Sequence, residues 1–231
     1  MAEPENRCSL SIILPVLDEA GCIVATLSRL QALRRQGAEL IVVDGGSRDG
    51  TVGLAEPLAD RVIASPRGRS LQMNAGAAIA TGDVLLFLHA DTSLPEEGWE
   101  AISHAVARGA VWGRFDVRID GRPWMLRVIA AMMNWRSRLS GIATGDQAIF
   151  VRRAAFLALG GYPPMPLMED LALSDALKAV SRPACLRSRV TTSGRRWERK
   201  GVWRTIFLMW RLRAAFRRGV SPDALARQYD T

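Results

Sequence analysis

The chain has 231 residues, 48% hydrophobic and 23% charged, a balance typical of a folded globular protein that excludes an intrinsically disordered one. Its three cysteines are odd in number and lack metal-ligand spacing, which argues against a disulfide framework and predicts a reducing, cytoplasmic location. The first residues lack the apolar run of a signal peptide, and no apolar stretch reaches the roughly 20 residues of a membrane-spanning helix, so we expect neither.

The net charge of +8 is concentrated in the C-terminal part of the chain. From Arg182 onward, 13 Lys and Arg residues stand against 3 Asp and Glu residues, a balance of +10, whereas the preceding residues sum to −2. A nearly neutral body with a basic tail indicates an anionic partner. Because no nucleic-acid-binding motif accompanies this charge, we expect no nucleic-acid partner and favour an anionic membrane surface.

Strand-like and helix-like segments alternate over the first half of the chain. Short apolar runs predict strands over residues 10–14, 40–43, 61–64 and 84–88. Apolar residues at helical spacing predict helices over residues 20–35, 69–80 and 95–108, with a short helix from residue 51. Repeated β-α units of this length predict an α/β fold with a mostly parallel, Rossmann-like sheet flanked by helices.

The second half of the chain is less regular. The same criteria predict strands over residues 111–119 and 147–151 and an edge strand over 185–192. They predict helices from residue 123, after residue 151, and over residues 171–180 and 201–218, the last being basic and amphipathic. A loop rich in glycine and proline precedes Glu169, and no linker is long enough to divide the chain into two domains.

Several carboxylates are expected to meet at one edge of the sheet. Asp44 and Asp91 each follow an apolar run, which puts them at the carboxyl ends of parallel strands, where open α/β sheets bind ligands. Together with Glu169 and Asp170 they would suit a divalent cation and a diphosphate. Structural roles are open as well: an Asx-turn for Asp44, the start of a turn for Asp91, and an acidic helix N-terminus for Glu169 and Asp170.

Five motifs, in this order along the chain, resemble those of family 2 glycosyltransferases with the GT-A fold. The motifs are Pro15-Val16-Leu17-Asp18-Glu19, residues 43–51, Gly68-Arg69 with Asn74-Ala75-Gly76, residues 88–92, and Met168-Glu169-Asp170. The resemblance implies inverting transfer of a sugar from a nucleoside-diphosphate sugar to an acceptor hydroxyl or phosphate, assisted by Mg²⁺ or Mn²⁺. It implies one GT-A domain over residues 1–231, with a nucleotide-sugar-binding half (9–110), an acceptor and catalytic half (111–199) and a basic helical tail (200–231).

The resemblance also implies roles for individual residues. Asp170 is the implied general base with Glu169 as its supporting neighbour, and Asp91 is the implied metal ligand. The residues implied to bind the donor are Pro15, Glu19, Asp44, Arg69, Asn74, His89 and Asp91. Those implied on the acceptor or diphosphate side are Asp146, Gln147, Arg196 and Trp197.

Two of these positions have open alternatives. His89 stands where the family's D-X-D motif begins with Asp, which leaves the ribose contact and the metal preference open. Its side chain either hydrogen-bonds the donor or is a satisfied buried histidine. Arg69, at the start of a predicted helix, either meets a diphosphate or is a solvated surface arginine.

Two predicted helices combine tryptophans with arginines. Trp203, Phe207 and Trp210 form an apolar stripe beside basic residues in the last helix, and a similar segment begins at Trp124. Such helices suit an anionic membrane interface, which would place the protein peripherally at the inner face of the cytoplasmic membrane with a lipid acceptor, such as a polyprenyl phosphate or a carotenoid-like alcohol. The alternative is that both helices cap the sheet and bury their tryptophans in the core.

Two other functions compete with glycosyl transfer. A nucleotidyltransferase would carry a glycine-rich phosphate loop with Arg or Lys after the first strand, where this chain has Pro15 to Glu19. A degenerate transferase acting as a membrane-surface adaptor is favoured only by His89. The sequence therefore predicts an enzyme, a glycosyltransferase dependent on a nucleotide sugar.

Overall fold

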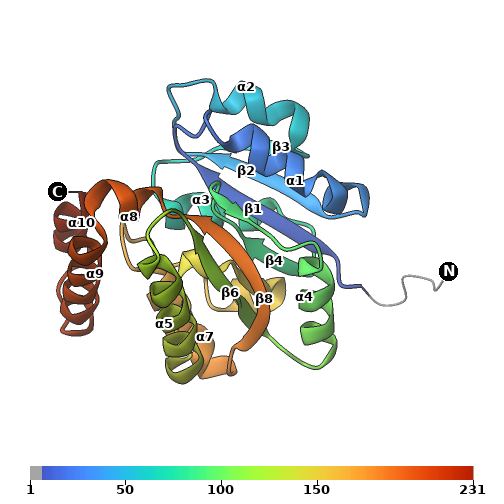
Figure 1. Cartoon of the computed structure of the whole chain (residues 1–231). Helices are drawn as coiled ribbons and strands as arrows, with labels where there is room; N and C mark the ends of the chain where they lie inside the picture. Colours follow the sequence, from blue (N-terminus) through green and yellow to red (C-terminus); the bar gives the residue numbers. More distant parts are fainter. Residues whose placement is uncertain (1–6, 231) are drawn as a thin grey trace.

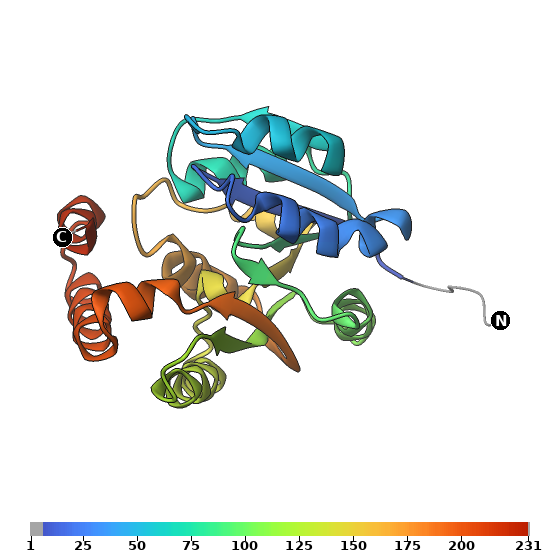
Figure 2. The same ribbon diagram turned by 45° about the horizontal axis from the view of Figure 1, so that its top comes forward.

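The computed structural model describes residues 7–230, which form a curled eight-stranded sheet with helices on both faces (Figures 1 and 2). The strands are β1 (Leu10–Val16), β2 (Glu39–Asp44), β3 (Arg61–Ala64), β4 (Val84–Phe87), β5 (Thr92–Ser93), β6 (Trp112–Asp120), β7 (Ile149–Arg152) and β8 (Ala184–Ser193). Their order is β3-β2-β1-β4-β7-β6-β8-β5. The first four are parallel, as the β-α repeats predict, whereas β7 is antiparallel to both its neighbours and β8 is parallel to β6.

The helices mostly lie where apolar periodicity predicts them. They are α1 (Ile23–Arg35), α2 (Thr51–Ala55), α3 (Arg69–Ile79), α4 (Gly98–Ala107), α5 (Met125–Ser140), α6 (Arg153–Ala158), α7 (Glu169–Val180), α8 (Arg195–Lys200), α9 (Val202–Arg217) and α10 (Pro222–Asp230), with 3₁₀ turns η1 (Glu56–Leu58) and η2 (Gly145–Gln147). Within residues 7–230, no helix has both the length and the apolar character needed to cross a membrane.

The core forms two layers because the central strands are buried on both faces. In β1, Ile12 and Leu14 belong to one apolar cluster together with side chains of α1, α4 and α5. Ile13 belongs to a second cluster with side chains of α3, α6 and α7. This period-two division across a continuous apolar strand is typical of a parallel sheet covered by helices on both sides. The sheet edge that carries the predicted site is therefore supported from both faces.

The structure differs from the sequence-based prediction in three places. Gln147 does not begin a strand: it closes η2, where its side-chain oxygen accepts the Thr144 N–H (3.2 Å), and β7 starts at Ile149. The strand predicted as an edge strand, β8, lies between β6 and the short strand β5. Three elements, β5, α8 and α10, have no counterpart in the prediction. With two and six residues, β5 and α8 are too short to give a periodic signal.

Gly76 allows α3 to approach the sheet closely. A Cβ at this position would lie 2.5 Å from Ile13 Cγ2 and 3.0 Å from Val43 Cγ2. Because both neighbours are buried strand residues, we expect Gly76→Ala to lower the free energy of unfolding by about 1–3 kcal/mol, measured by urea denaturation. The matched control is Gly53→Ala in α2, where a Cβ has nothing within 4 Å and should stabilise by about 0.5–1 kcal/mol. Equal effects at both glycines would contradict the close approach.

Candidate functional site

The predicted site residues start from the carboxyl ends of adjacent parallel strands. Asp44 is the last residue of β2, and Pro15 lies beside Val43 in the neighbouring strand β1. Asp91 lies between β4, the other neighbour of β1, and β5. These strand ends point to the side of the molecule on which the C-terminal helices lie (Figure 1). The topology thus puts Asp44 and Asp91 at one edge of the sheet.

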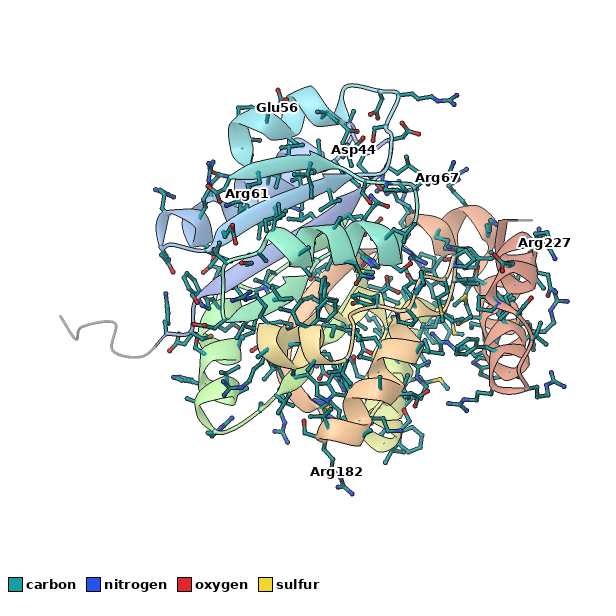
Figure 3. The ribbon with its side chains drawn as sticks, turned by 180° about the vertical axis from the view of Figure 1, so that it is seen from behind. Asp44, Glu56, Arg61, Arg67, Arg182 and Arg227 are labelled. Carbon is teal, nitrogen blue, oxygen red and sulfur yellow. The ribbon has the colours of Figure 1, made fainter. Side chains whose placement is uncertain are left out.

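Asp44 shapes the glycine-rich turn that follows it. Its Oδ2 accepts hydrogen bonds from the N–H groups of Gly46 (2.9 Å) and Ser47 (3.0 Å), which is an Asx-turn. The next residue, Arg48, donates its N–H to Asp18 Oδ1 (2.8 Å), so this turn is tied to the loop after β1. Figure 3 shows Asp44 at the end of its strand, on the same side as Arg67. The structure thus shows the Asx-turn role that was open for Asp44, and this role is compatible with donor binding by the same residue.

Glu19 and Asn74 also make contacts within the protein. Glu19 Oε2 accepts a hydrogen bond from Cys22 Sγ (3.0 Å). The Asn74 amide donates to the Tyr162 carbonyl (2.8 Å) and accepts the Tyr162 N–H (2.9 Å). Asn74 therefore fastens α3 to the loop that leads to α7, which positions that loop. Direct contact of either residue with a donor stays a prediction.

A buried glutamine that the sequence reading missed holds two strand ends together. Gln72 Nε2 donates to the carbonyls of Val16 and Val43, both at 2.8 Å, and the side chain is buried against Gly45. The signal in the sequence was a polar residue on the inward face of a predicted helix. Its effect is to fix the spacing of β1 and β2 where their acidic loops begin.

Residues far apart in the sequence form one group of charges at this edge. Asp170, at the start of α7, accepts the Gly145 N–H through Oδ2 at 2.9 Å. The next residue along η2, Asp146, faces His89, with 3.6 Å between its Oδ1 and the histidine Nδ1. A Cβ on Gly145 would lie 2.6 Å from the His89 ring, so only a glycine fits between these groups without a shift. The loop at η2 thus connects His89 to Asp170.

The arginine at the start of α3 completes the group. Arg69 Nε lies 2.9 Å from Glu169 Oε1, and 41% of the arginine side chain remains exposed. Glu169 is buried, and its other oxygen, Oε2, has no hydrogen-bond partner within residues 7–230. Arg69 is therefore an exposed arginine that is held in an ion pair at a helix N-terminus, with part of its surface open to a ligand.

Burial and mutual charge shift the pKa values in this group. Burial raises the pKa of both Asp170 and Glu169 above the usual range of carboxyl groups; the Gly145 N–H opposes this at Asp170, and the Arg69 charge opposes it at Glu169. Burial disfavours charge on His89 and Asp146 as well, but their mutual contact outweighs it, so the His89 pKa is raised and the Asp146 pKa is lowered. The result is a protonatable carboxyl beside a charge-stabilised His–Asp pair.

The residues predicted on the acceptor side divide into two groups. Arg196 stacks on Tyr229, with its guanidinium carbon 3.6 Å from the ring centroid, and donates to the Tyr229 hydroxyl. Its charge also acts on Asp146, which links it to the group above. Gln147, in contrast, is fully buried, and Trp197 packs against the main core cluster, so both have structural roles. Tyr229 was missed because it belongs to α10.

The residues present fit one mode of divalent metal binding. In the part of the chain that the structure describes, no group of three or more His, Cys, Asp or Glu side chains could hold a metal ion by itself. Mg²⁺ and Mn²⁺, however, are often bound by one or two carboxylates together with substrate phosphates. Asp91 is half-buried, and its charge acts on His89. The Asp91 carboxylate fits metal binding shared with substrate phosphates, whereas the described residues offer no closed protein cage for the ion.

Comparisons with known proteins agree with this arrangement. Residues 11–157 match the family model described as glycosyl transferase family 2. A PGL/p-HBAD biosynthesis glycosyltransferase of Mycobacterium bovis is 32% identical over 164 residues, covering 66% of this chain and 62% of that protein. An uncharacterized glycosyltransferase of Mycobacterium tuberculosis is 30% identical over 168 residues, covering 67% of this chain and 75% of that protein. The chain thus spans about three-fifths of the length of the first of these relatives.

Two solved structures have a similar fold. The mannosyltransferase PcManGT from Pyrobaculum calidifontis, in complex with GDP-Man and Mn²⁺, has a TM-score of 0.66 and 19% identity, covering 98% of this chain and 70% of that chain. Residues 1–349 of TarS from S. aureus, in complex with UDP-GlcNAc, have a TM-score of 0.65 and 17% identity, covering 80% of this chain and 58% of that chain. The predicted GT-A fold is confirmed. On the evidence of its sheet and of the match over residues 11–157, the chain belongs to glycosyl transferase family 2.

Proposed function

We propose that the protein transfers a sugar, with inversion, from a nucleoside-diphosphate sugar to an acceptor hydroxyl or phosphate. The observation that carries this proposal is Asp170: a half-buried carboxylate with a raised pKa, oriented by the Gly145 N–H and grouped with Arg69 and His89. The similar structures bound to GDP-Man and UDP-GlcNAc support a nucleotide-sugar donor. In one domain over residues 1–231, residues 9–110 would bind this donor and residues 111–199 would carry the acceptor and catalytic groups.

The proposed reaction uses Asp170 as the general base. The carboxylate takes the proton of the acceptor hydroxyl while that oxygen attacks the anomeric carbon from the face opposite the nucleotide. The bond between the anomeric carbon and the diphosphate oxygen breaks, and its electron pair leaves with the nucleoside diphosphate. A raised pKa makes Asp170 a better proton acceptor near neutral pH than an ordinary carboxylate. Glu169, paired with Arg69, would be its supporting neighbour.

On the donor side, Arg69 would bind the diphosphate, since a guanidinium and the free N–H groups of a helix N-terminus both favour phosphate. Asp91 would hold Mg²⁺ or Mn²⁺, which when bound neutralises charge on the departing diphosphate. The remaining residues proposed to contact the donor are Pro15, Glu19, Asp44, Asn74 and His89. Because the side chains of Glu19 and Asn74 already make hydrogen bonds within the protein, these two residues would contact the donor through their backbone atoms or after their side chains change conformation.

On the acceptor side, we propose Asp146 and Arg196, with Gln147 and Trp197 supporting the wall behind them. Arg196 would favour an acceptor that carries negative charge near the reacting oxygen. We further propose that the acceptor is lipid-linked and that the enzyme works in the cytoplasm, peripherally at the inner face of the membrane. Residues 200–231 would form the basic tail that contacts this membrane.

A thermal-shift experiment with nucleotides tests the proposed donor class. At a concentration of 100 times Kd, a nucleoside diphosphate or its sugar would stabilise the native state by about 2.7 kcal/mol. For a protein of this size that corresponds to a rise in Tm of roughly 5–10 °C. A response to GDP or UDP compounds with Mn²⁺ is expected. No response to any nucleotide would contradict the proposal, and a preference for triphosphates would indicate nucleotidyl transfer.

Replacing Asp91 with Ala is expected to remove the part of this Tm rise that depends on Mn²⁺, because the carboxylate links the cation to the protein. The nucleotide alone should still bind through Arg69 and the strand-end loops. Asp83→Ala, at an exposed position before β4, is the matched control and should keep the Mn²⁺ response. An unchanged Mn²⁺ response in Asp91→Ala would exclude Asp91 as a ligand.

A further inference from the structure

Large apolar side chains are exposed together on α5 and α9. Of the 14 large hydrophobic side chains exposed within residues 7–230, eight lie on these two helices and the residue that precedes α5, and they include all four exposed tryptophans. We name this surface the interfacial face, and it consists of Trp124, Val128, Met132, Trp135, Leu139, Trp203, Phe207 and Trp210. Trp124 is 72% exposed, Trp135 66% and Trp203 63%. The alternative that these tryptophans are core residues is therefore wrong.

Helix α9 lies at the end of the molecule opposite the N-terminal end, and α5 lies between it and the middle of the molecule, along the lower edge (Figures 1 and 2). Burial lowers the pKa of Arg136 on α5, and the charge of Arg217 on α9 adds to this effect. The interfacial face thus consists of two exposed apolar stripes, one on each helix. Exposed apolar surface of this kind marks a binding site.

The charge around the interfacial face has one sign. On α5 and α9 there is no Asp or Glu, and there are seven arginines: Arg127, Arg136, Arg138, Arg204, Arg211, Arg213 and Arg217. On α9 the apolar residues at positions 203, 207 and 210 occupy the centre of the exposed surface, because residues three, four and seven apart share one face of a helix. Arg204 and Arg211 lie on one side of this stripe and Arg217 on the other. A surface of tryptophan rimmed by arginine is complementary to a layer that is apolar inside and anionic outside.

A basic cavity opens beside the interfacial face. Its volume is about 340 Å³, and the described residues that line it include Lys200, Arg204, Arg211 and Phe207. The cations Lys200 and Arg211 beside the Phe207 ring suit a phosphate group with an attached apolar chain better than a free apolar ligand. This cavity lies between α9 and the ends of α8 and α10, on the same basic part of the chain.

The interfacial face is connected to the proposed catalytic residues. On its inner side, α9 buries Leu212 in a cluster with Leu225 of α10 and with Leu167, Met168 and Leu171. The last three residues flank Glu169 and Asp170. The same pair of helices supplies Tyr229 to Arg196. Helix α9 thus lies between the interfacial face, on its outer side, and the residues that flank the proposed base, on its inner side.

We propose that the interfacial face docks on the surface of an anionic lipid bilayer, with the basic cavity taking a lipid phosphate. The tryptophans enter the headgroup layer, where their amphipathic rings are most stable, and the arginines contact the anionic lipids. A second copy of the chain is a poorer occupant, because a symmetric contact would press two arginine-rimmed, acid-free surfaces together. This inference deepens the proposed function by naming the partner, yet docking itself needs no donor and no transfer.

Co-sedimentation with vesicles tests docking without any nucleotide. We expect the full chain to bind vesicles of phosphatidylcholine with phosphatidylglycerol much more strongly than vesicles of phosphatidylcholine alone. Trp203→Ser with Phe207→Ser and Trp210→Ser should reduce partitioning at least tenfold. The matched control, Leu157→Ser with Val180→Ser, changes side chains that are each 51% exposed on α6 and α7 and should bind as the unmodified protein does.

The electrostatic part of the inference has its own pair of variants. Arg211→Gln with Arg217→Gln and Arg218→Gln should weaken binding to anionic vesicles and reduce its dependence on salt. The control replaces three exposed arginines elsewhere, Arg182, Arg187 and Arg189, with Gln, at the same change in net charge. Figure 3 shows Arg182 at the bottom of the molecule, apart from the C-terminal helices at the right, which carry Arg227. Equal loss in both variants would mean that net charge, not the interfacial face, causes binding, and would overturn the inference.

A measurement on the unmodified protein guards against misfolded variants. Phospholipids brominated along their acyl chains should quench its tryptophan fluorescence, because the exposed tryptophans would lie within the bilayer surface. Absence of quenching together with absence of sedimentation would overturn docking. Docking would also be overturned if the protein does not bind vesicles but forms a dimer in analytical ultracentrifugation, and if this dimer is lost in the variant with Ser at Trp203, Phe207 and Trp210. In each case the nucleotide-dependent rise in Tm reports on the proposed transferase separately, since the substituted residues are not proposed to bind the donor.

Discussion

Replacing Asp170 with Asn is expected to lower kcat by about 10²–10⁴-fold, the usual contribution of a general base. The amide keeps the size of the side chain and can still accept the Gly145 N–H, but it cannot take the acceptor's proton. Nucleotide binding, measured as the rise in Tm, should remain, because Arg69 and the strand-end loops are unchanged. The experiment requires an acceptor, which mass spectrometry of reactions with lipid extracts and nucleotide sugars would supply.

The matched control for this substitution is Asp175→Asn on the same helix. Asp175 is 65% exposed and lies 3.7 Å from Lys178 in an ion pair within one turn, which contributes little to stability. It should keep full activity. If Asp170→Asn also keeps full activity, Asp170 is not the base.

The same carboxyl group predicts how activity depends on pH. Burial raises the pKa of Asp170, and only its ionised form accepts a proton, so log kcat should rise with pH through this raised pKa and fall below it. The sign for stability is the opposite. The folded state binds the Asp170 proton more tightly than the unfolded state does. The stability gained from this proton is therefore present at pH values below the pKa of Asp170 in the unfolded chain, and it is lost as the pH rises through the pKa of Asp170 in the folded protein. Asp170→Asn should therefore be more stable than the unmodified protein at neutral pH, which urea denaturation would measure.

Replacing Asp116 with Ala is expected to lower the free energy of unfolding by about 3–5 kcal/mol, the cost of leaving a buried charge without its partner. The charge is that of Arg114, whose side chain is 0% exposed and pairs with Asp116. Arg138 also donates to both Asp116 oxygens, at 3.0 and 2.8 Å. This network joins β6 to α5, so its loss should also loosen the helix that carries half of the interfacial face.

Two further variants separate the buried charge from a general loss of contacts. Adding Arg114→Met to Asp116→Ala should restore part of the lost stability, because the uncompensated cation is removed. Arg61→Gln breaks the partly exposed pair of Arg61 and Glu39, at 3.5 Å, and should change stability by about 1 kcal/mol or less. A loss of under about 1 kcal/mol in Asp116→Ala would show that the Arg114 charge is compensated by its bonds to Ser137 and the Asn134 carbonyl.

Local sequence patterns predicted the donor-side half of the fold well. The strands around Ile41 and Leu86 are continuous apolar runs because both faces of the sheet are covered, and each helix between them shows its inward stripe. The acids at the strand ends follow from the same pattern, since parallel strands end at one edge. The second half was harder because β7 reverses direction and α8 is too short to show a period; in the first half, the two-residue strand β5 was missed for the same reason.

Periodicity could not assign the tryptophan stripe of α9 to a face. An amphipathic stripe normally turns to the core, but here Thr205 and Leu212 are the buried residues while Trp203, Phe207 and Trp210 are exposed. The sequence contains both stripes, and only the cluster around Leu225 of α10 decides which of them the protein buries. The exposed face of α9 could therefore be recognised only from the structure, which shows α10 covering the opposite face.

The sequence by itself determined the family, the parallel half of the sheet, and the chain positions where acids meet its edge, because these depend on residue type and on short-range periodicity. Tertiary structure alone decided which of those side chains keep a charge available and which are used in packing. It turned the amides of Gln147 and Asn74 into internal contacts, and it grouped His89, Asp146 and Asp170 around Gly145. The physical reason is that hydrogen-bond partners and burial are set by segments distant in the chain, and no local pattern records them.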